Sequence, residues 1–119
     1  MIRIHIISES AAVGNRLRDI LFQAGYTEST VSGLSAATSE RLNGILIIYA
    51  KSRIADIMQI AAACEAQVIL LLNPDRYARY LDRARHIGIK LLLMPVAPDT
   101  LLDAVATFSE QTAQNRCAF

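Results

Sequence analysis

Side chains that could take part in chemistry follow the ends of three apolar stretches. Ser8 and Glu9 follow the first, Tyr49 ends the second with Lys51 close behind, and Asn73 follows the third. Glu9 could bind a cation, but a divalent ion needs several oxygen ligands, so a solvated carboxylate at a helix start is the commoner case. Tyr49 could stack on a ligand, but a tyrosine ending a buried stretch more often packs its ring and leaves its hydroxyl near water. Lys51 could pair with Glu9.

The sequence contains no recognisable set of residues for catalysis or metal binding. It has no glycine-rich phosphate loop, no nucleophile elbow, and no Ser/His/Asp or Cys/His set at suitable positions. Its only histidines, His5 and His86, belong to no metal-binding motif. Cys64 and Cys117 form no CxxC pair, so we expect two reduced thiols. We therefore expect no enzyme activity, no bound metal and no cofactor.

Composition indicates one domain that is neither a membrane protein nor a general polyanion binder. The 119 residues are 53% apolar, and 12 basic residues face 11 acidic ones. That balance gives no overall attraction for nucleic acid or an anionic membrane. No apolar stretch approaches the ~20 residues that span a bilayer. The first residues pass directly into a strand-like pattern without the features of a signal peptide, so we expect a cytoplasmic location.

Two apolar patterns alternate along the chain. Continuous apolar stretches predict β-strands over 2–7, 30–31, 45–49, 68–72 and 91–93. Helical periodicity predicts helices over 13–24, 35–42, 54–63 and 74–86, and a last helix from residue 98. Such alternation implies an α/β fold, a three-layer αβα sandwich. Its five-stranded parallel sheet would have the flavodoxin-like order 2-1-3-4-5.

An ordered set of turn and strand features resembles the receiver (CheY-like) domain of response regulators. The features are Ala24-Gly25-Tyr26 after the first helix, Gly88 before the fifth strand, and Met94-Pro95-Val96 followed by a helix start at Pro98-Asp99. The likeness covers residues 1–108. Residues 109–119 are polar, and we interpret them as an extension of the last helix or a tail.

The resemblance implies a phosphorylation pocket whose residues have been replaced. Receivers place an acidic pair after strand one, which falls on Ser8 and Glu9, and a phosphoacceptor aspartate after strand three, which falls on Tyr49. Their hydroxyl residue after strand four falls on Leu72, and their lysine after strand five on Met94. Only Glu9 keeps its chemistry, so the resemblance implies a degenerate pocket. The stretch from Tyr49 to Leu72 is also several residues shorter than usual, which we interpret as a trimmed loop after strand three.

Among receiver-like proteins, the chain is most similar to the N-terminal domain of ANTAR-type antitermination regulators. The similarity lies in the Ala24-Gly25-Tyr26 segment and the fifth strand after Gly88. Those regulators continue into a coiled coil and an RNA-binding helical bundle. We expect either a free-standing module or the N-terminal domain of a longer regulator, with no direct nucleic-acid binding by this domain.

The helix expected over 74–86 carries the most basic stretch of the chain, with Arg76, Arg79, Arg83 and Arg85, and Lys90 beyond it. Asp75 and Asp82 would offset part of this charge through pairs along the helix. Tyrosine and arginine are enriched at the centres of protein interfaces. A solvated face with its tyrosines packed on the sheet explains the pattern equally well. A nucleic-acid surface is less favoured because the stretch is small and glycine-poor.

The leading hypothesis is a phosphorylation-independent signalling module in two-component-type signalling or transcription regulation. A protein partner or a second copy would dock on the last two helices and the strand between them. The candidate contact residues are Arg76, Tyr77, Tyr80, Arg83, Leu101 and Leu102. The alternatives are a small-ligand sensor that uses an apolar pocket at Tyr49, Leu72 and Met94, and the N-terminal part of an RNA-binding antiterminator.

Overall fold

A computed structural model describes residues 4–26, 29–32, 44–63 and 67–117. The elements in chain order are β1 (Ile4–Ser8), α1 (Ala11–Gln23), β2 (Ser29–Ser32), β3 (Ile45–Tyr49), α2 (Ile54–Ala63), β4 (Gln67–Leu72), α3 (Pro74–Ile87), β5 (Lys90–Leu93) and α4 (Pro98–Cys117). All strand pairs are parallel, and the sheet order is β2-β1-β3-β4-β5. The predicted fold class and strand order are confirmed.

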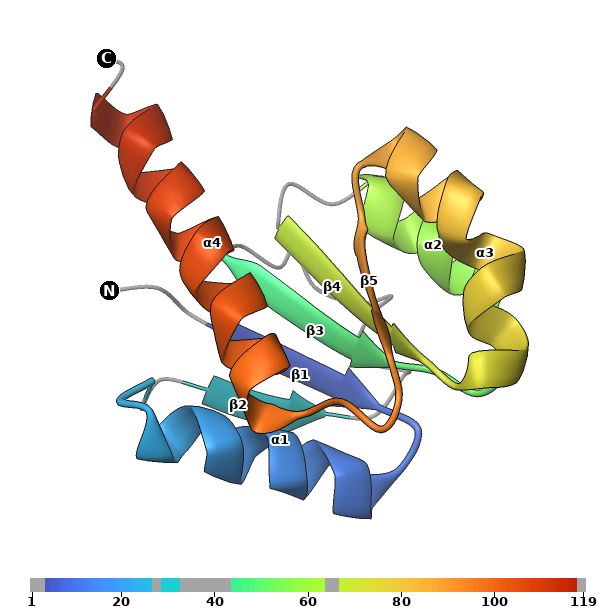
Figure 1. Ribbon diagram of the computed structural model, residues 1–119, viewed down its shortest axis with the longest axis horizontal. Helices are drawn as coiled ribbons and strands as arrows, with labels where there is room; N and C mark the ends of the chain where they lie inside the picture. The colour runs from blue at the N-terminus through green and yellow to red at the C-terminus, as the bar shows by residue number, and fades with distance from the viewer. Residues whose placement is uncertain (1–3, 27–28, 33–43, 64–66, 118–119) are drawn as a thin grey trace.

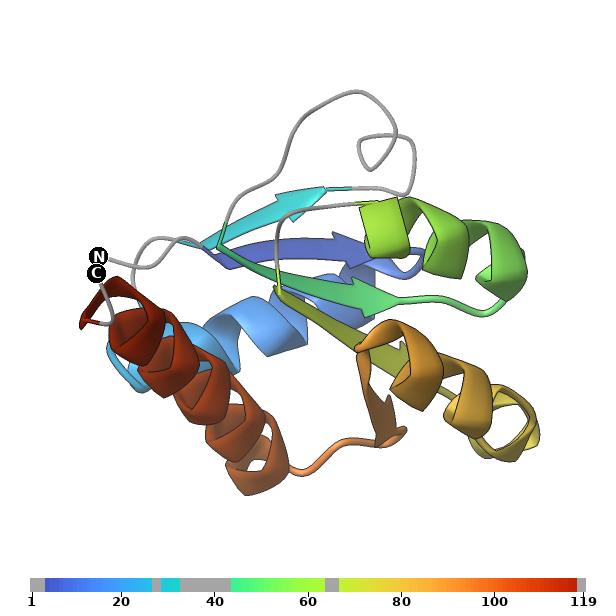
Figure 2. The same ribbon diagram turned by 90° about the horizontal axis from the view of Figure 1, so that it is seen from above.

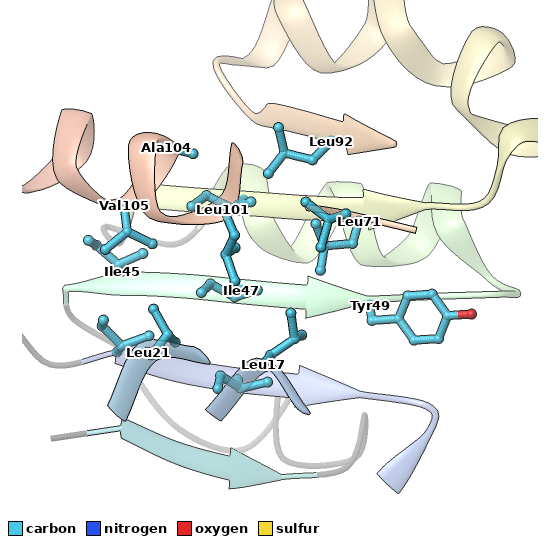
Figure 3. Packing of buried hydrophobic residues seen from close by; sticks show 14 residues of the cluster. Leu17, Leu21, Ile45, Ile47, Tyr49, Leu71, Leu92, Leu101, Ala104 and Val105 are labelled. Carbon is cyan, nitrogen blue, oxygen red and sulfur yellow. The ribbon is translucent and has the colours of Figure 1, made fainter. Parts of the chain in front are cut away.

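Helices cover both faces of the sheet (Figures 1 and 2). Residues of α1 and α4, such as Leu17 and Val105, pack on one face. Residues of α2 and α3, such as Met58 and Ala84, pack on the other. Because successive side chains of a strand point to opposite faces, β3 sends Ile47 into the first cluster and Ile48 into the second. This is why the central strands read as continuous apolar stretches. Figure 3 shows the cluster on the side of α1 and α4.

Local signals in the sequence define most of the helix ends. The Ser10 side chain caps α1 by accepting a hydrogen bond from the Val13 N–H at 3.4 Å. Gly88 ends α3 in the left-handed region, with φ of 80°. Asn73 precedes Pro74 at the start of α3, but its side chain makes no capping hydrogen bond. Asn73 is thus the N-cap residue by its backbone position, and its side chain has a different partner, described below.

The predicted elements agree with the structure within one to three residues at most ends. The predicted helix 54–63 matches α2, and the predicted helix 74–86 continues one residue further, to Ile87. The last helix runs to Cys117, and its C-terminal part extends past the sheet in Figure 1. The helix predicted over 35–42 lies outside the described residues, as does Cys64. No helix in the described ranges is long and apolar enough to cross a membrane.

Candidate functional site

Glu9 connects two loops at the carboxyl edge of the sheet. It follows β1, and its two carboxylate oxygens accept hydrogen bonds from the loop between β3 and α2. Glu9 Oε2 accepts from the Lys51 backbone N–H at 2.8 Å, and Oε1 accepts from the Ser52 hydroxyl at 3.0 Å. The Glu9 backbone N–H also donates to the Tyr49 carbonyl at 3.2 Å. Both carboxylate oxygens are thus engaged by groups of the chain itself.

Tyr49 ends β3 and points along the strand at the carboxyl edge (Figure 3). Its side chain is 4% exposed and belongs to the apolar cluster under α1 and α4. Its hydroxyl lies 3.4 Å from Asn73 Oδ1, to which it donates a long hydrogen bond. The Lys51 ammonium lies 5.9 Å from the centre of the ring, within reach of a cation–π interaction. Tyr49 is thus held by the core below and by polar groups at its tip.

The other three pocket positions are occupied by side chains of the core or of a turn. The hydroxyl of Ser8 donates to the Ser10 carbonyl at 2.6 Å and accepts from the Ser10 N–H at 3.1 Å, which closes a tight turn into α1. Leu72 is fully buried under α2 and α3. Met94 is partly buried against the opposite cluster. None of the three directs a charged group at Glu9 or Tyr49.

The charge pair that Glu9 and Lys51 could form is not present among the described residues. The carboxylate binds the backbone of Lys51, while the ammonium lies over Tyr49. The sequence analysis missed Ser52 as a partner of Glu9 and Asn73 as a partner of Tyr49. Spacing alone could not reveal either contact, because each joins residues far apart in the chain. In the described part, no group of three or more His, Cys, Asp and Glu residues could hold a metal ion.

A second candidate surface lies at the opposite edge of the sheet from β2, where α3, β5 and α4 meet. We call it the α3–β5–α4 face and define it by Arg76, Tyr77, Tyr80, Arg83, Lys90, Leu93 and Leu102. Arg83, Lys90 and Leu93 are exposed. Tyr77 and Tyr80 are half-buried and pack against the α2/α3 cluster, which accounts for their apolar rings.

The structure differs from the predicted contact surface in two details. Leu101 of α4 is fully buried, so its side chain belongs to the core and cannot contact a partner. Its neighbour Leu102 is half-buried. The expected pairs of Asp82 with arginines of its own helix are absent from the described ion pairs. Only Arg76 is paired on α3, with the adjacent Asp75 at 3.6 Å. The arginines of this helix are therefore less neutralised than expected.

The strand order, the helices on both faces and the loops at the carboxyl edge define the fold of a response-regulator receiver domain, CheY-like. A receiver domain from Clostridium thermocellum has a TM-score of 0.70 at 16% identity, over 96% of this chain and 98% of that one. The putative pilus assembly protein CpaE from Burkholderia thailandensis has a TM-score of 0.69 at 23% identity, over 92% and 99%. A response regulator from Burkholderia multivorans has a TM-score of 0.58 at 27% identity, over 92% and 96%. No protein-family model and no curated protein matches the sequence.

Proposed function

We propose that this chain is a receiver-like signalling module that works by protein association and is not phosphorylated. The fold supports a role in two-component signalling or transcription regulation. The absence of phosphorylation is proposed from one observation on Glu9. Both of its carboxylate oxygens accept hydrogen bonds from the loop at Lys51 and Ser52. A carboxylate committed in this way is a poor ligand for the divalent ion that a receiver needs.

The pocket chemistry points the same way. An acyl phosphate forms on a carboxylate, and Tyr49 stands at the acceptor position with a phenol whose ring is packed in the core. Leu72 and Met94 stand where a hydroxyl and a lysine would contact the phosphoryl group, and neither side chain can neutralise its charge. The proposal therefore assigns the pocket a structural role and the α3–β5–α4 face the contact role.

Phosphorylation is tested directly. The protein is incubated with acetyl phosphate and Mg²⁺, and separately with beryllofluoride, beside a receiver that has all the pocket residues. We expect no mass gain of a phosphoryl group and no change in backbone amide spectra around Glu9 and Tyr49. A Mg²⁺-dependent mass gain that survives in Tyr49→Phe but disappears in Glu9→Gln would overturn the proposal.

Docking is tested by charge reversal at matched positions. Arg83→Glu changes the α3–β5–α4 face, whereas Arg16→Glu changes another exposed arginine, on α1, across the sheet. Self-association is measured by sedimentation, and a partner is identified by cross-linking with its contacts mapped onto this chain. We expect Arg83→Glu to weaken the association by about tenfold and Arg16→Glu to leave it unchanged. Equal effects of the two variants, or cross-links confined to α1, would contradict the docking role.

The other two functions receive less support. A small-ligand sensor needs an open apolar lining, but Tyr49 and Leu72 are buried, and their side chains already pack in the core. The likeness to antitermination regulators rests on the segment at Gly25 and on the fifth strand. Gly25 has φ of 98°, so it is required by the turn after α1 and supports the fold more than a particular subfamily.

A further inference from the structure

β5 is one of the two edge strands of the sheet, and no strand of the described residues pairs with its outer side. The Met94 N–H donates to the Leu72 carbonyl of β4 at 2.9 Å. Because the peptide groups of a strand point alternately to its two sides, the N–H and C=O groups of Leu91 and Leu93 point away from β4. Leu93 is also 46% exposed, one of the two large apolar side chains that are well exposed in the described part of the chain. The outer side of β5 thus offers unpaired backbone groups beside an apolar side chain.

Two hollows flank this strand, one on each face of the sheet, and Lys90 lines both. The hollow between β5 and α4 has a volume of about 450 Å³ and is lined by Lys90, Leu92, Thr100, Asp103, Ala104, Thr107 and Phe108. The hollow between β5 and α3 has a volume of about 130 Å³ and is lined by Tyr77, Leu81, Ala84, Arg85, Ile89, Lys90 and Leu91. An added strand sends alternate side chains to the two faces, so its neighbouring residues would enter different hollows.

The two hollows differ in charge. On the α3 side the charged lining side chain is that of Arg85, with no carboxylate among the lining residues. Lys90 lines this hollow too, but its side chain points to the α4 face, as that of Leu92 does. The α4 side is mainly apolar and hydroxylic, and Asp103 offsets Lys90 there. An acidic side chain is therefore favoured on the α3 side and an aliphatic one on the α4 side. A strand that alternates acidic and aliphatic residues satisfies both faces at once.

We propose that β5 accepts an extended segment of a partner protein as an additional strand, and that this segment alternates acidic and aliphatic residues. The inference rests on the proposed docking function and specifies its binding mode. Backbone hydrogen bonds to Leu91 and Leu93 provide the register. Arg85 selects the acidic positions, while Leu92 and Ala104 contact the aliphatic ones.

A second copy of the chain is a less suitable occupant. Antiparallel pairing of two β5 strands places the two α3 helices on the same side of the joined sheet, because the two-fold axis is perpendicular to it. Each α3 carries Arg76, Arg79, Arg83 and Arg85 against only two aspartates. The helices would repel each other along the contact, whereas an acidic segment is attracted to the same residues.

The test uses a labelled short peptide in which Glu and Val alternate, a peptide of the same composition with its acids grouped, and a peptide alternating Lys and Val. Binding is measured by fluorescence anisotropy, and protection of the Leu91 and Leu93 amides by hydrogen exchange. We expect only the Glu/Val alternation to bind and to protect both amides. Arg85→Glu should weaken this binding by about tenfold.

One pair of variants isolates the backbone contribution. Leu93→Pro removes an N–H that points away from β4, so it should abolish peptide binding while the β4 ladder stays intact. Leu93→Ala shortens the same side chain but keeps the N–H, and should retain binding. Thermal denaturation confirms that both variants fold. Binding by Leu93→Pro, equal binding of the grouped-acid peptide, or amide protection that appears without peptide and grows with protein concentration would each overturn the inference.

The inference and the proposed function fail in different ways. If Arg83→Glu weakens the association with a mapped partner but Leu93→Pro does not, the docking face stands and strand addition is wrong. If neither variant changes that association, the docking function itself is wrong.

Discussion

At the scale of single residues, Glu9 joins the loop after β1 to the loop after β3. Its two hydrogen bonds hold Lys51 and Ser52 just before Arg53, which has φ of 55°. A non-glycine residue in this left-handed region costs roughly 1 kcal/mol and is retained only where its neighbours fix the backbone. The Glu9 contacts supply such a constraint. They hold the β3–α2 loop against the loop after β1.

Removal of the Glu9 carboxylate should release this loop. Glu9→Ala leaves the Lys51 N–H and the Ser52 hydroxyl to water, and we expect a loss of about 1 kcal/mol in the free energy of unfolding, because these groups are exposed. Glu9→Gln keeps one acceptor and should lose about half as much. Urea denaturation measures the stability, and hydrogen exchange at the Lys51 amide reports the loop. Asp19→Ala, on the exposed side of α1, is the control, and an unchanged Lys51 exchange rate in Glu9→Ala would count against the link.

At the scale of elements, α1 lies unusually close to β1 and β2 at Gly14. A Cβ atom at this position would lie 2.9 Å from Val31 Cγ1 and 3.3 Å from Ser8 Cβ. Gly14→Ala gains up to about 1 kcal/mol in helix propensity but forces these groups apart. We expect a net destabilisation of about 1–2 kcal/mol in urea denaturation, since overpacking typically costs more than propensity returns. The double variant Gly14→Ala with Val31→Ala should show a favourable coupling between the two sites, and additive effects would refute the close contact.

Gly14 and α4 also show where prediction from the sequence stops. Strand order and most element ends could be predicted, because continuous and periodic apolar patterns depend only on neighbouring residues. From the sequence alone, Gly14 is simply a poor helix former. The structure explains why a glycine is needed there: α1 lies so close to Val31 of β2 that a side chain would not fit. Leu101 and Leu102 are equally apolar, yet adjacent helical residues point about 100° apart, so only Leu101 reaches the core. Ser52 could not be predicted as the partner of Glu9 for the same reason, because the two residues are far apart in the chain.

At the scale of the whole molecule, the two apolar clusters share the central strands, so they should unfold together. Leu70 faces the cluster under α2 and α3, and Leu71 faces the cluster under α1 and α4. Both side chains are essentially inaccessible, so Leu70→Ala and Leu71→Ala should each cost about 2–5 kcal/mol, whereas the exposed Leu93→Ala should cost less than about 1 kcal/mol. Far-UV circular dichroism and tyrosine fluorescence should give coincident denaturation curves with an unchanged slope in all three variants. A variant that loses one cluster first, seen as separated curves, would show that the sheet joins two independent halves.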